Sequence, residues 1–225
     1  MQDKVVVVTG AFGVLGRAAA ARAKAMGARV VMIDYAPAPA EFAADPLAFG
    51  GADLTKSDAA AAVMQQARSA AGRIDALLNI AGGFTWRTLE DGDCALWDMM
   101  YALNLKTAVN ASKAALPHLI ESGGAIVNVG AAAALKAAAG FGAYAASKSG
   151  VHKLTESLAQ ELKGRVRVNA VLPSVLDTAQ NRKDMPDIDP TIWVQPDDLA
   201  KVMLFLAGCD ARAITGALVP VTGQV

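Results

Sequence analysis

A tyrosine and a lysine stand four residues apart in the run Tyr144-Ala145-Ala146-Ser147-Lys148. On a helix this spacing places both side chains on the same face, one turn apart. A nearby ammonium favours the phenolate, so we expect the pKa of Tyr144 to fall from its ordinary value of about 10. Such a phenol can exchange a proton with a substrate. The pair alone is a common coincidence, so its meaning depends on the rest of the chain.

A glycine-rich turn follows the first strand-like run of the chain. The residues Thr9-Gly10-Ala11-Phe12-Gly13-Val14-Leu15-Gly16 lead directly into an alanine-rich helical window. Glycines let the backbone turn tightly and approach a pyrophosphate, and the start of the helix supplies free N–H groups and the positive end of its dipole. This position, between the first strand and the first helix, predicts a dinucleotide site. The expected contacts there are Gly10, Gly13, Leu15 and Gly16.

The end of the second strand-like run indicates which dinucleotide binds. Asp34 lies there, where a carboxylate can accept hydrogen bonds from the adenosine ribose hydroxyls. A 2′-phosphate near it would be repelled by about 4 kcal/mol per unit charge at about 4 Å, for an effective dielectric near 20. The next residue is Tyr35, and Arg17 is the only basic side chain near the glycine turn. We therefore predict NAD(H) rather than NADP(H) as the cofactor.

Short β-branched runs alternate with longer alanine-rich helical windows, and several runs are apolar throughout, as in parallel strands covered on both faces. The pattern predicts one α/β domain over residues 1–225, a Rossmann-like doubly wound parallel sheet in a three-layer sandwich. The expected strands are Lys4–Thr9, Arg29–Ile33, Leu47–Gly51, Ile74–Asn79, Ala125–Val129, Arg165–Val171 and Leu218–Val221. The expected helices are Val14–Met26, Lys56–Ala71, Asp93–Leu119, Ala143–Leu162 and Pro196–Leu206. One long irregular stretch, Pro173–Gln195, is predicted to be functional or disordered.

Composition and charge argue against several classes of protein. The 21 Lys and Arg residues equal the 21 Asp and Glu residues, and no basic run occurs, so a nucleic-acid or anionic-membrane partner has no electrostatic support. The chain has no secretory leader and no apolar stretch long enough to span a membrane, which predicts a cytoplasmic protein. No group of His, Cys, Asp and Glu has the spacing of a metal site.

The cysteines and histidines have ordinary structural interpretations. Cys94 and Cys209 form no CxxC pair and are predicted to be small buried apolar residues in a reducing compartment. His118 is expected to interact with the end of a helix dipole. His152, four residues after Lys148, is expected to serve in packing or at an interface.

The glycine turn and the Tyr144–Lys148 pair together resemble the short-chain dehydrogenase/reductase family, and the resemblance extends over nearly the whole chain. It implies that both residues are catalytic and also contact the cofactor, exchanging a proton while hydride moves to or from nicotinamide. Asn104 resembles a helix asparagine of the family that anchors a proton-relay water near the lysine. Further cofactor contacts implied by the resemblance are Asp53, Leu54, Ala81, Gly82, Pro173, Leu176 and Thr178.

One departure from the family pattern concerns the substrate. The family's catalytic serine lies thirteen residues before the tyrosine, and here that position is Ala131, with no hydroxyl available within Ala131–Ala134. The dihydropteridine reductase branch of the family also has a small residue there. Two loop segments, Asn181–Pro186 and Ala81–Phe84, resemble that branch as well.

Three functions are consistent with this pattern. The leading hypothesis is NADH-dependent hydride transfer to a small conjugated substrate, as in dihydropteridine reductase. A ketone or alcohol oxidoreductase, including a 3-oxoacyl type, that manages without the serine is the second, and a non-catalytic NAD(H)-binding regulatory protein is the third. The family resemblance also implies a homodimer or homotetramer. The candidate substrate contacts are Phe84, Trp86, Ala131 and Trp193.

Overall fold

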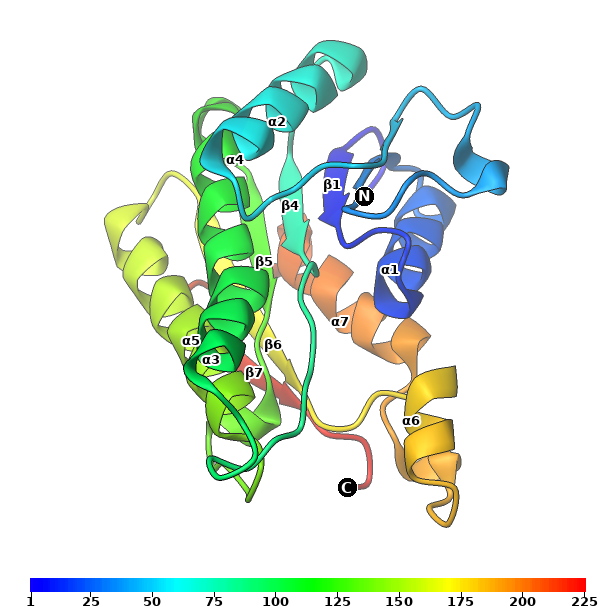
Figure 1. Cartoon of the computed structure of the whole chain (residues 1–225). Helices are drawn as coiled ribbons and strands as arrows, with labels where there is room; N and C mark the ends of the chain where they lie inside the picture. The colour runs from blue at the N-terminus through cyan, green and yellow to red at the C-terminus, as the bar shows by residue number, and fades with distance from the viewer.

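The computed structural model describes residues 1–225 and places seven parallel strands in one sheet (Figure 1). The sheet order is β3-β2-β1-β4-β5-β6-β7, which reverses direction between β1 and β4. Open α/β sheets bind ligands beyond the carboxyl ends of their strands at such a reversal. The strands are β1 (Val5–Thr9), β2 (Arg29–Ile33), β3 (Ala48–Phe49), β4 (Ala76–Asn79), β5 (Ala125–Val129), β6 (Arg167–Pro173) and β7 (Leu218–Val221).

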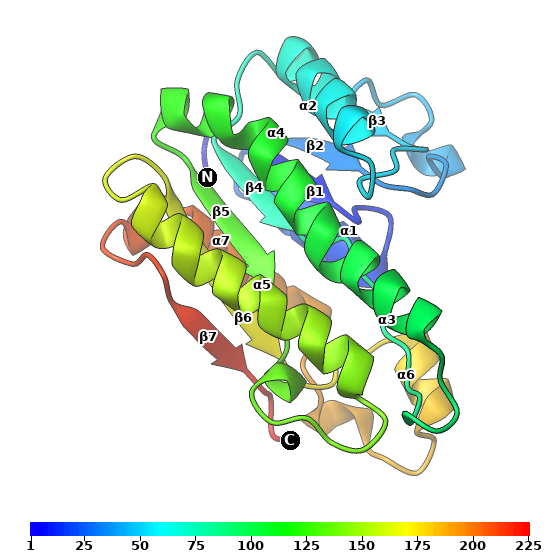
Figure 2. The same ribbon diagram turned by 60° about the vertical axis from the view of Figure 1, so that its left-hand side comes forward.

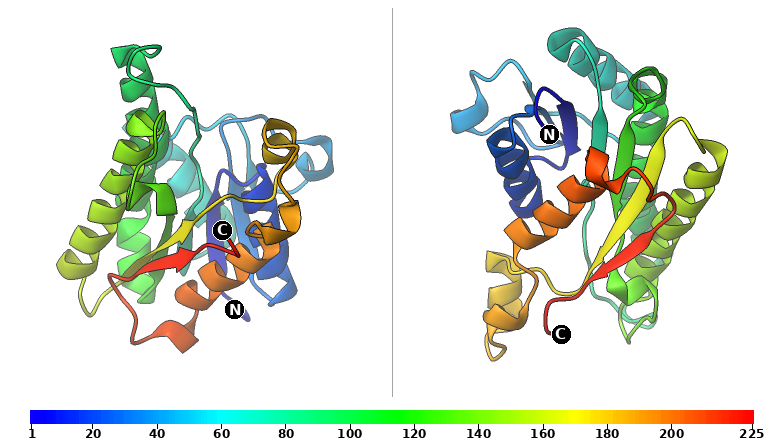
Figure 3. Two further views of the ribbon diagram at one scale, coloured as in Figure 1. Left: turned by 90° about the horizontal axis from the view of Figure 1, so that it is seen from below. Right: turned by 180° about the vertical axis from the view of Figure 1, so that it is seen from behind.

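Helices cover both faces of the sheet and form the outer layers of a three-layer sandwich. Figure 2 shows α2 (Ser57–Ala71), α4 (Thr107–Ser122) and α5 (Gly142–Glu161) across one face. The opposite face, seen from behind in Figure 3, carries α1 (Val14–Ala25) and α7 (Pro196–Ala207). This arrangement confirms the predicted fold class.

The sequence of β1 shows why these strands are apolar throughout. All five residues of Val5–Thr9 are buried. Successive side chains of a strand point to opposite faces, and here Val6 and Val8 join the core under α1 and α7 while Val5 and Val7 join the core under α2 and α4. A strand packed on both faces is therefore mostly apolar, and a polar side chain within it needs hydrogen-bond partners, as Asn169 of β6 has in Ile214 and Ala217.

The long helix expected at Asp93–Leu119 is interrupted at the site. It consists of α3 (Cys94–Met100), a π-helical segment η2 (Tyr101–Lys106) and α4. Asp93 caps its start by accepting a hydrogen bond from the Leu96 N–H at 2.9 Å. π-helical turns are rare and occur often at functional sites. This one contains Asn104.

The predicted irregular stretch Pro173–Gln195 contains ordered structure that the sequence analysis missed. Helix α6 (Ala179–Asp184) begins after Thr178, whose hydroxyl accepts a hydrogen bond from the Asn181 N–H at 3.1 Å. A helix of six residues is too short to produce a readable hydrophobic period. The other predicted helices and strands are present with small shifts at their ends, and the third strand is shortened to two residues.

The cysteine prediction is wrong, because Cys94 and Cys209 are both exposed. Each lies at the first residue of a helical segment, α3 and η5 (Cys209–Ala211), where the side chain faces outward. No helix of the chain is both long and apolar enough to cross a lipid bilayer.

One arginine holds the end of α7 to the sheet. The Nη1 of Arg167, in β6, donates to the carbonyls of Leu206 and Ala211 at 2.6 and 3.1 Å. Its Nη2 donates to the carbonyls of Ala207 and Gly208 at 3.1 and 2.8 Å. The last carbonyls of a helix have no partner within the helix, and a cation there also interacts favourably with the helix dipole.

Candidate active site

A large cleft lies beyond the carboxyl ends of the central strands, with a volume of about 1080 Å³. It runs from the β1–α1 turn past the end of β4 to the start of α5. Most of the residues predicted from the sequence line it together. They are Gly10, Gly13, Leu15, Gly16, Asp34, Asp53, Leu54, Ala81, Gly82, Phe84, Tyr144, Lys148, Leu176 and Thr178.

The glycine turn has a shape that only glycine allows. Gly10 has a φ of +61°, and a Cβ there would lie 2.9 Å from the Cα of Ala81. A Cβ on Gly16 would lie 2.6 Å from the Cα of Ala11, so α1 packs directly against the turn. The first turn of α1 has no side-chain cap and no acidic residue. Its free N–H groups therefore face the cleft and can bind an anionic group such as a pyrophosphate.

The carboxylate at the end of β2 is held in place by the glycine turn. Asp34 accepts hydrogen bonds from the Phe12 N–H at 2.8 Å and from the Ala36 N–H at 3.0 Å. Arg17 donates from Nε to the Phe12 carbonyl at 2.7 Å and forms an ion pair with Glu41. The one basic side chain beside the turn is therefore already paired. A second acidic group, Glu41, stands next to it.

The next two predicted contacts lie after β3. Asp53 accepts hydrogen bonds from the Thr55 hydroxyl at 2.6 Å and its N–H at 3.0 Å, and the hydroxyl bond is the main reason that the Asp53 pKa is lowered. The Leu54 side chain is buried, and its carbonyl accepts from Asn110 Nδ2 at 2.9 Å. Both residues line the cleft at the end nearer to Asp34.

Tyr144 and Lys148 lie in the first two turns of α5, and both titrate away from their ordinary values. Burial raises the pKa of Tyr144 to about 12 and lowers the pKa of Lys148 to about 8. The Lys148 Nζ donates to the Val129 carbonyl at 2.8 Å. The expected fall in the pKa of Tyr144 is therefore wrong, because desolvation of the phenolate dominates at this site.

Asn104 does not line the cleft but joins two elements behind it. It is 1% exposed. Its Oδ1 accepts from the Gly83 N–H at 2.9 Å, and its Nδ2 donates to the Gly83 carbonyl and to Ser147 Oγ, both at 3.0 Å. The amide of Asn104 thus pairs with both polar groups of Gly83. It holds the loop that carries Phe84 against α5.

Aromatic rings surround the Tyr144 side chain. The ring centroid of Phe84 lies 4.9 Å from that of Tyr144 in an edge-on arrangement. Phe141 lies 5.3 Å from Phe84 and 6.4 Å from Tyr144. Met99 and Leu103 line the same part of the cleft. The sequence analysis missed Phe141, Met99 and Leu103, and only the position of Phe141 three residues before Tyr144 could have indicated it.

Several predicted residues lie outside the cleft. Trp193 and Ala131 are 3% and 2% exposed and belong to the protein interior. Trp193 is a core residue because its loop folds back beside α7, and Ala131 is covered by α5. Pro173 is the last residue of β6 and does not line the cleft. Trp193 and Ala131 were predicted substrate contacts and Pro173 a predicted cofactor contact, and none of the three lines the cleft.

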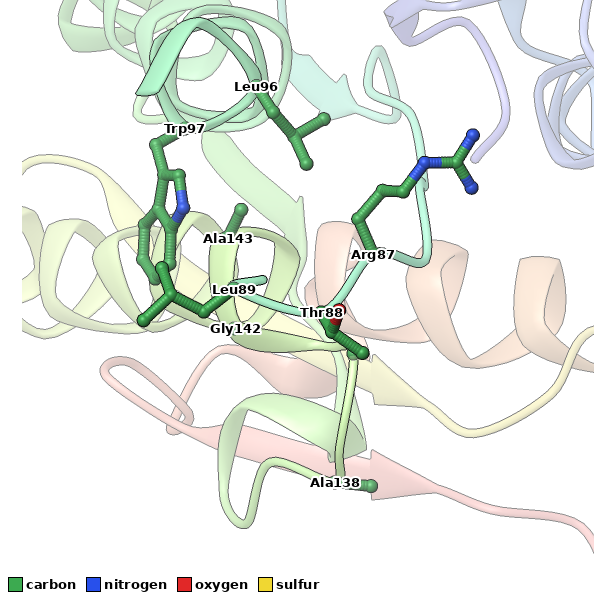
Figure 4. Close-up of a pocket in the computed structure, with 9 residues that line it drawn as sticks. Arg87, Thr88, Leu89, Leu96, Trp97, Ala138, Gly142 and Ala143 are labelled. Carbon is green, nitrogen blue, oxygen red and sulfur yellow. The ribbon is translucent and has the colours of Figure 1, made fainter. Parts of the chain in front are cut away.

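Trp86 lines neither the large cleft nor the smaller cavity beside it. Its Nε1 donates to the Ala139 carbonyl at 3.0 Å. The neighbouring cavity, of about 300 Å³, lies between the loop after β4, helix α3 and the start of α5 (Figure 4). Trp97 and Leu96 project into it from α3, while the guanidinium of Arg87 points away from them. This cavity shares no lining residue with the large cleft.

Comparison with known proteins identifies relatives that match nearly the whole chain. A family model described as short chain dehydrogenase matches residues 4–189. The chain is 32% identical to a 2-(S)-hydroxypropyl-CoM dehydrogenase of Xanthobacter autotrophicus, covering 99% of this chain and 96% of that protein. It is 34% identical to a meso-2,3-butanediol dehydrogenase of Serratia marcescens, covering 98% and 94%. The structure of carveol dehydrogenase from Mycobacterium avium in complex with NAD superposes with a TM-score of 0.87 at 27% identity, covering 100% and 98%.

Proposed function

Because the chain belongs to the short-chain dehydrogenase/reductase family, we propose that it reduces a small conjugated substrate with NADH, using Tyr144 as the proton donor. The chain is an NAD(H)-dependent oxidoreductase. One observation supports the finer assignment. The Tyr144 phenol lies beside the rings of Phe84 and Phe141 in the inner part of the cleft, and residue 131 supplies no second hydroxyl.

The cleft residues fit a dinucleotide of this kind. Gly10 and Gly16 let the turn pack closely against Ala81 and Ala11, and the N–H groups at the start of α1, which line the cleft, can bind a pyrophosphate. Asp34 would hold the adenosine ribose, and Asp53 and Leu54 would contact the adenine. The contacts proposed nearer the nicotinamide are Ala81, Gly82, Lys148, Leu176 and Thr178. When bound, the cofactor supplies or accepts the hydride.

The protein's own contribution is a proton at the Tyr144 Oη. Because burial raises the pKa of Tyr144 to about 12, the phenol keeps its proton throughout the neutral range. It is therefore in the correct state to protonate a substrate during reduction. Lys148 lies one helical turn away, and its ammonium offsets negative charge left on the phenolate. The rings of Phe84 and Phe141 pack edge-on or tilted beside the phenol ring.

The walls around Tyr144 support a planar, uncharged substrate. Phe84, Met99 and Leu103 present apolar surface, and Lys148 is the one charged side chain lining this part of the cleft. In a conjugated ring the negative charge that develops spreads over several atoms, so a single donor is sufficient. The Asn181–Pro186 resemblance to dihydropteridine reductase supports the same class less strongly. Here Asn181 Nδ2 binds the Leu176 carbonyl, so that residue has a structural role.

The second candidate function is oxidation of an alcohol or reduction of a ketone. The relatives described above support it, because both curated proteins are named as dehydrogenases. A ketone concentrates negative charge on one oxygen, which in this protein Tyr144 would stabilise alone. The non-catalytic alternative has no comparable support, since Tyr144 and Lys148 both face the cleft.

The cellular location and oligomeric state of the protein are also proposals. We propose a cytoplasmic enzyme with a small-molecule substrate and no nucleic-acid or membrane partner. A homodimer or homotetramer would cover exposed apolar side chains of the η2–α4 region such as Tyr101 and Val109.

The substrate proposal is tested by assaying NADH oxidation with a quinonoid dihydropterin and with a panel of ketones. The wild-type protein should turn over the dihydropterin and act weakly on ketones. Ala131→Ser should change dihydropterin turnover by less than about threefold. It should raise ketone reduction by up to about tenfold if the added hydroxyl reaches the carbonyl oxygen. Brisk ketone reduction by the wild type, with no dihydropterin turnover, would establish the second candidate instead.

The NADH preference should depend on Asp34 and on the pairing of Arg17. We expect NADPH to bind at least about tenfold more weakly than NADH, because its 2′-phosphate meets two carboxylates. Asp34→Ser should narrow this difference, and Glu41→Gln should narrow it further by releasing Arg17 from its ion pair. Fluorescence titration gives both dissociation constants. Asp45→Asn is the control. It breaks the ion pair of Asp45 with Lys24 of α1 and should leave both dissociation constants unchanged. Equal binding of both cofactors by the wild type would contradict this prediction.

The rate of reduction should fall as the pH rises through about 8. Lys148 carries its charge below that pH and loses it above, because burial lowers its pKa to about 8. The measurement is the pH dependence of kcat/KM for reduction. In Lys148→Arg the guanidinium stays charged, so the residual activity should show no fall until beyond about pH 10. If kcat/KM of Lys148→Arg still fell near pH 8, the titrating group would be a residue other than Lys148.

A further inference from the structure

His152 is a buried titratable residue with no role in the reaction described above. It lies in α5, one helical turn after Lys148, and is 4% exposed. Its Nε2 accepts a hydrogen bond from the Ala131 N–H at 3.3 Å. Ala131 occupies the sequence position where the family resemblance implies a serine. The imidazole therefore contacts the backbone of the residue whose side chain departs from the family pattern.

The segment Val129–Ala131, at the end of β5, is held by hydrogen bonds at each of its three residues. The Val129 carbonyl accepts from Lys148 Nζ at 2.8 Å, and the Gly130 N–H donates to the Val171 carbonyl at 2.9 Å. The Ala131 N–H completes the series at His152. Two of these three partners, Lys148 and His152, lie on the same face of α5 at a spacing of four residues.

The close approach of His152 to this segment requires a glycine. A Cβ on Gly130 would lie 2.5 Å from His152 Nε2 and 3.3 Å from Leu172 Cδ1. The imidazole, carried by α5, thus lies directly against Gly130. A displacement of the Ala131 peptide would also move Val129, two residues earlier, and so shift the carbonyl that holds Lys148.

Burial, with the help of nearby charges, favours the neutral form of the ring. Burial is the main cause that lowers the pKa of His152 below its ordinary value. The ammonium groups of Lys148 and Lys153 act in the same direction, and Glu156 opposes them. The segment packed against the ring after β5 is uncharged, with Gly130 at the closest approach. A neutral ring that accepts at Nε2 must carry its proton on Nδ1.

We propose that His152 is a positioning residue which, by accepting the Ala131 N–H, keeps the Val129 carbonyl directed at Lys148 Nζ. Protonation of Nε2 would place two N–H donors opposite each other, break this bond and release the segment. The proposal rests on the proposed function only in taking Lys148 as part of the reacting site. Activity should therefore fall at low pH, as His152, which lies outside the cleft, becomes protonated.

The tautomer of His152 can be measured without any assay of activity. The chain has two histidines, so His118→Gln leaves His152 as the only imidazole. Nitrogen NMR at pH 7 should show a protonated Nδ1 and an unprotonated Nε2. The ring should titrate below the ordinary imidazole value of about 6.5. A protonated Nε2 at pH 7, in either the neutral or the charged ring, would overturn the proposal.

Two substitutions test the effect on the reaction. His152→Leu fills the space but cannot accept a hydrogen bond, and it should lower kcat by about tenfold with little change in the KM for NADH. His152→Gln can present Oε1 to the Ala131 N–H, and it should stay within about threefold of the wild type. It should also lose the acid-side fall in kcat, because an amide does not titrate. Wild-type kcat in His152→Leu, or an acid-side fall that persists in His152→Gln, would refute the positioning role.

Failure of this proposal differs from failure of the proposed function. If the wild type turned over none of the substrates with NADH, the proposed function would fail while the NMR result stood. If His152→Leu and His152→Gln did not fold, as judged by circular dichroism, the proposal would be tested by the tautomer and titration of His152 in the His118→Gln protein. That variant changes a half-buried residue in α4, away from the cleft.

Discussion

Replacing Tyr144 with phenylalanine should lower NADH-dependent turnover by about 10²–10⁴-fold while leaving NADH binding nearly unchanged. The substitution removes one oxygen and keeps the ring. The contacts of that ring with Phe84 and Phe141, at 4.9 and 6.4 Å between centroids, can therefore persist. The proton donor is lost, and residue 131 has no hydroxyl to replace it. Steady-state kinetics and a fluorescence titration of NADH separate the two effects.

Tyr101→Phe is a matched control for this substitution. Tyr101 lies in η2, is 52% exposed and does not line the cleft, so its loss of a hydroxyl should leave turnover unchanged. Lys148→Ala should differ from both, because we expect it to weaken turnover and cofactor binding together. A Tyr144→Phe protein within threefold of wild-type turnover would show that another group, or water, supplies the proton.

Replacing Arg167 with alanine should destabilise the fold by about 3 kcal/mol, which corresponds to a fall in Tm of roughly 6–12 °C for a chain of this length. The guanidinium donates to four carbonyls at the end of α7 and in the turn after it. Alanine would remove all four of these bonds, although the Ala211 carbonyl keeps the Ile214 N–H at 2.9 Å, and it would remove a cation from the negative end of the helix dipole. Thermal unfolding followed by circular dichroism gives the measurement.

Arg165 provides the comparison within the same segment. Its Nη2 donates to one carbonyl, that of Glu161, at an exposed position, so Arg165→Ala should change stability by less than about 1 kcal/mol. The loss of stability in Arg167→Lys should lie between those of Arg165→Ala and Arg167→Ala. An ammonium keeps the charge but cannot donate in four directions as the planar guanidinium does. Similar Tm values for Arg165→Ala and Arg167→Ala would contradict the capping role.

The Asn181–Arg182 run shows how a resemblance can have a structural cause. It belongs to the segment Asn181–Pro186, which resembles one branch of the family. In the structure Asn181 binds the Leu176 carbonyl, and Arg182 pairs with Asp177 through two bonds of 2.6 and 2.7 Å. These contacts hold the segment before α6, so the run gives weaker evidence about the substrate than its position in a loop suggested.

The sequence alone was sufficient for features that depend on residues close together in the chain. The turn at Gly10–Gly16 follows from local backbone freedom, and the apolar runs follow from burial on both faces of a sheet. The shared face of Tyr144 and Lys148 follows from the helical period. These features determined the fold class, the family and the cofactor, because each is encoded within a few consecutive residues.

The tertiary structure alone decided how each group is solvated and what it contacts. Burial raised the pKa of Tyr144, which its spacing from Lys148 had suggested would fall. Folding buried Trp193 and Ala131 and exposed both cysteines. It also brought His152 to the Ala131 N–H. Desolvation and hydrogen bonding at these positions depend on strands and helices that are distant in the chain and meet only when the sheet is assembled.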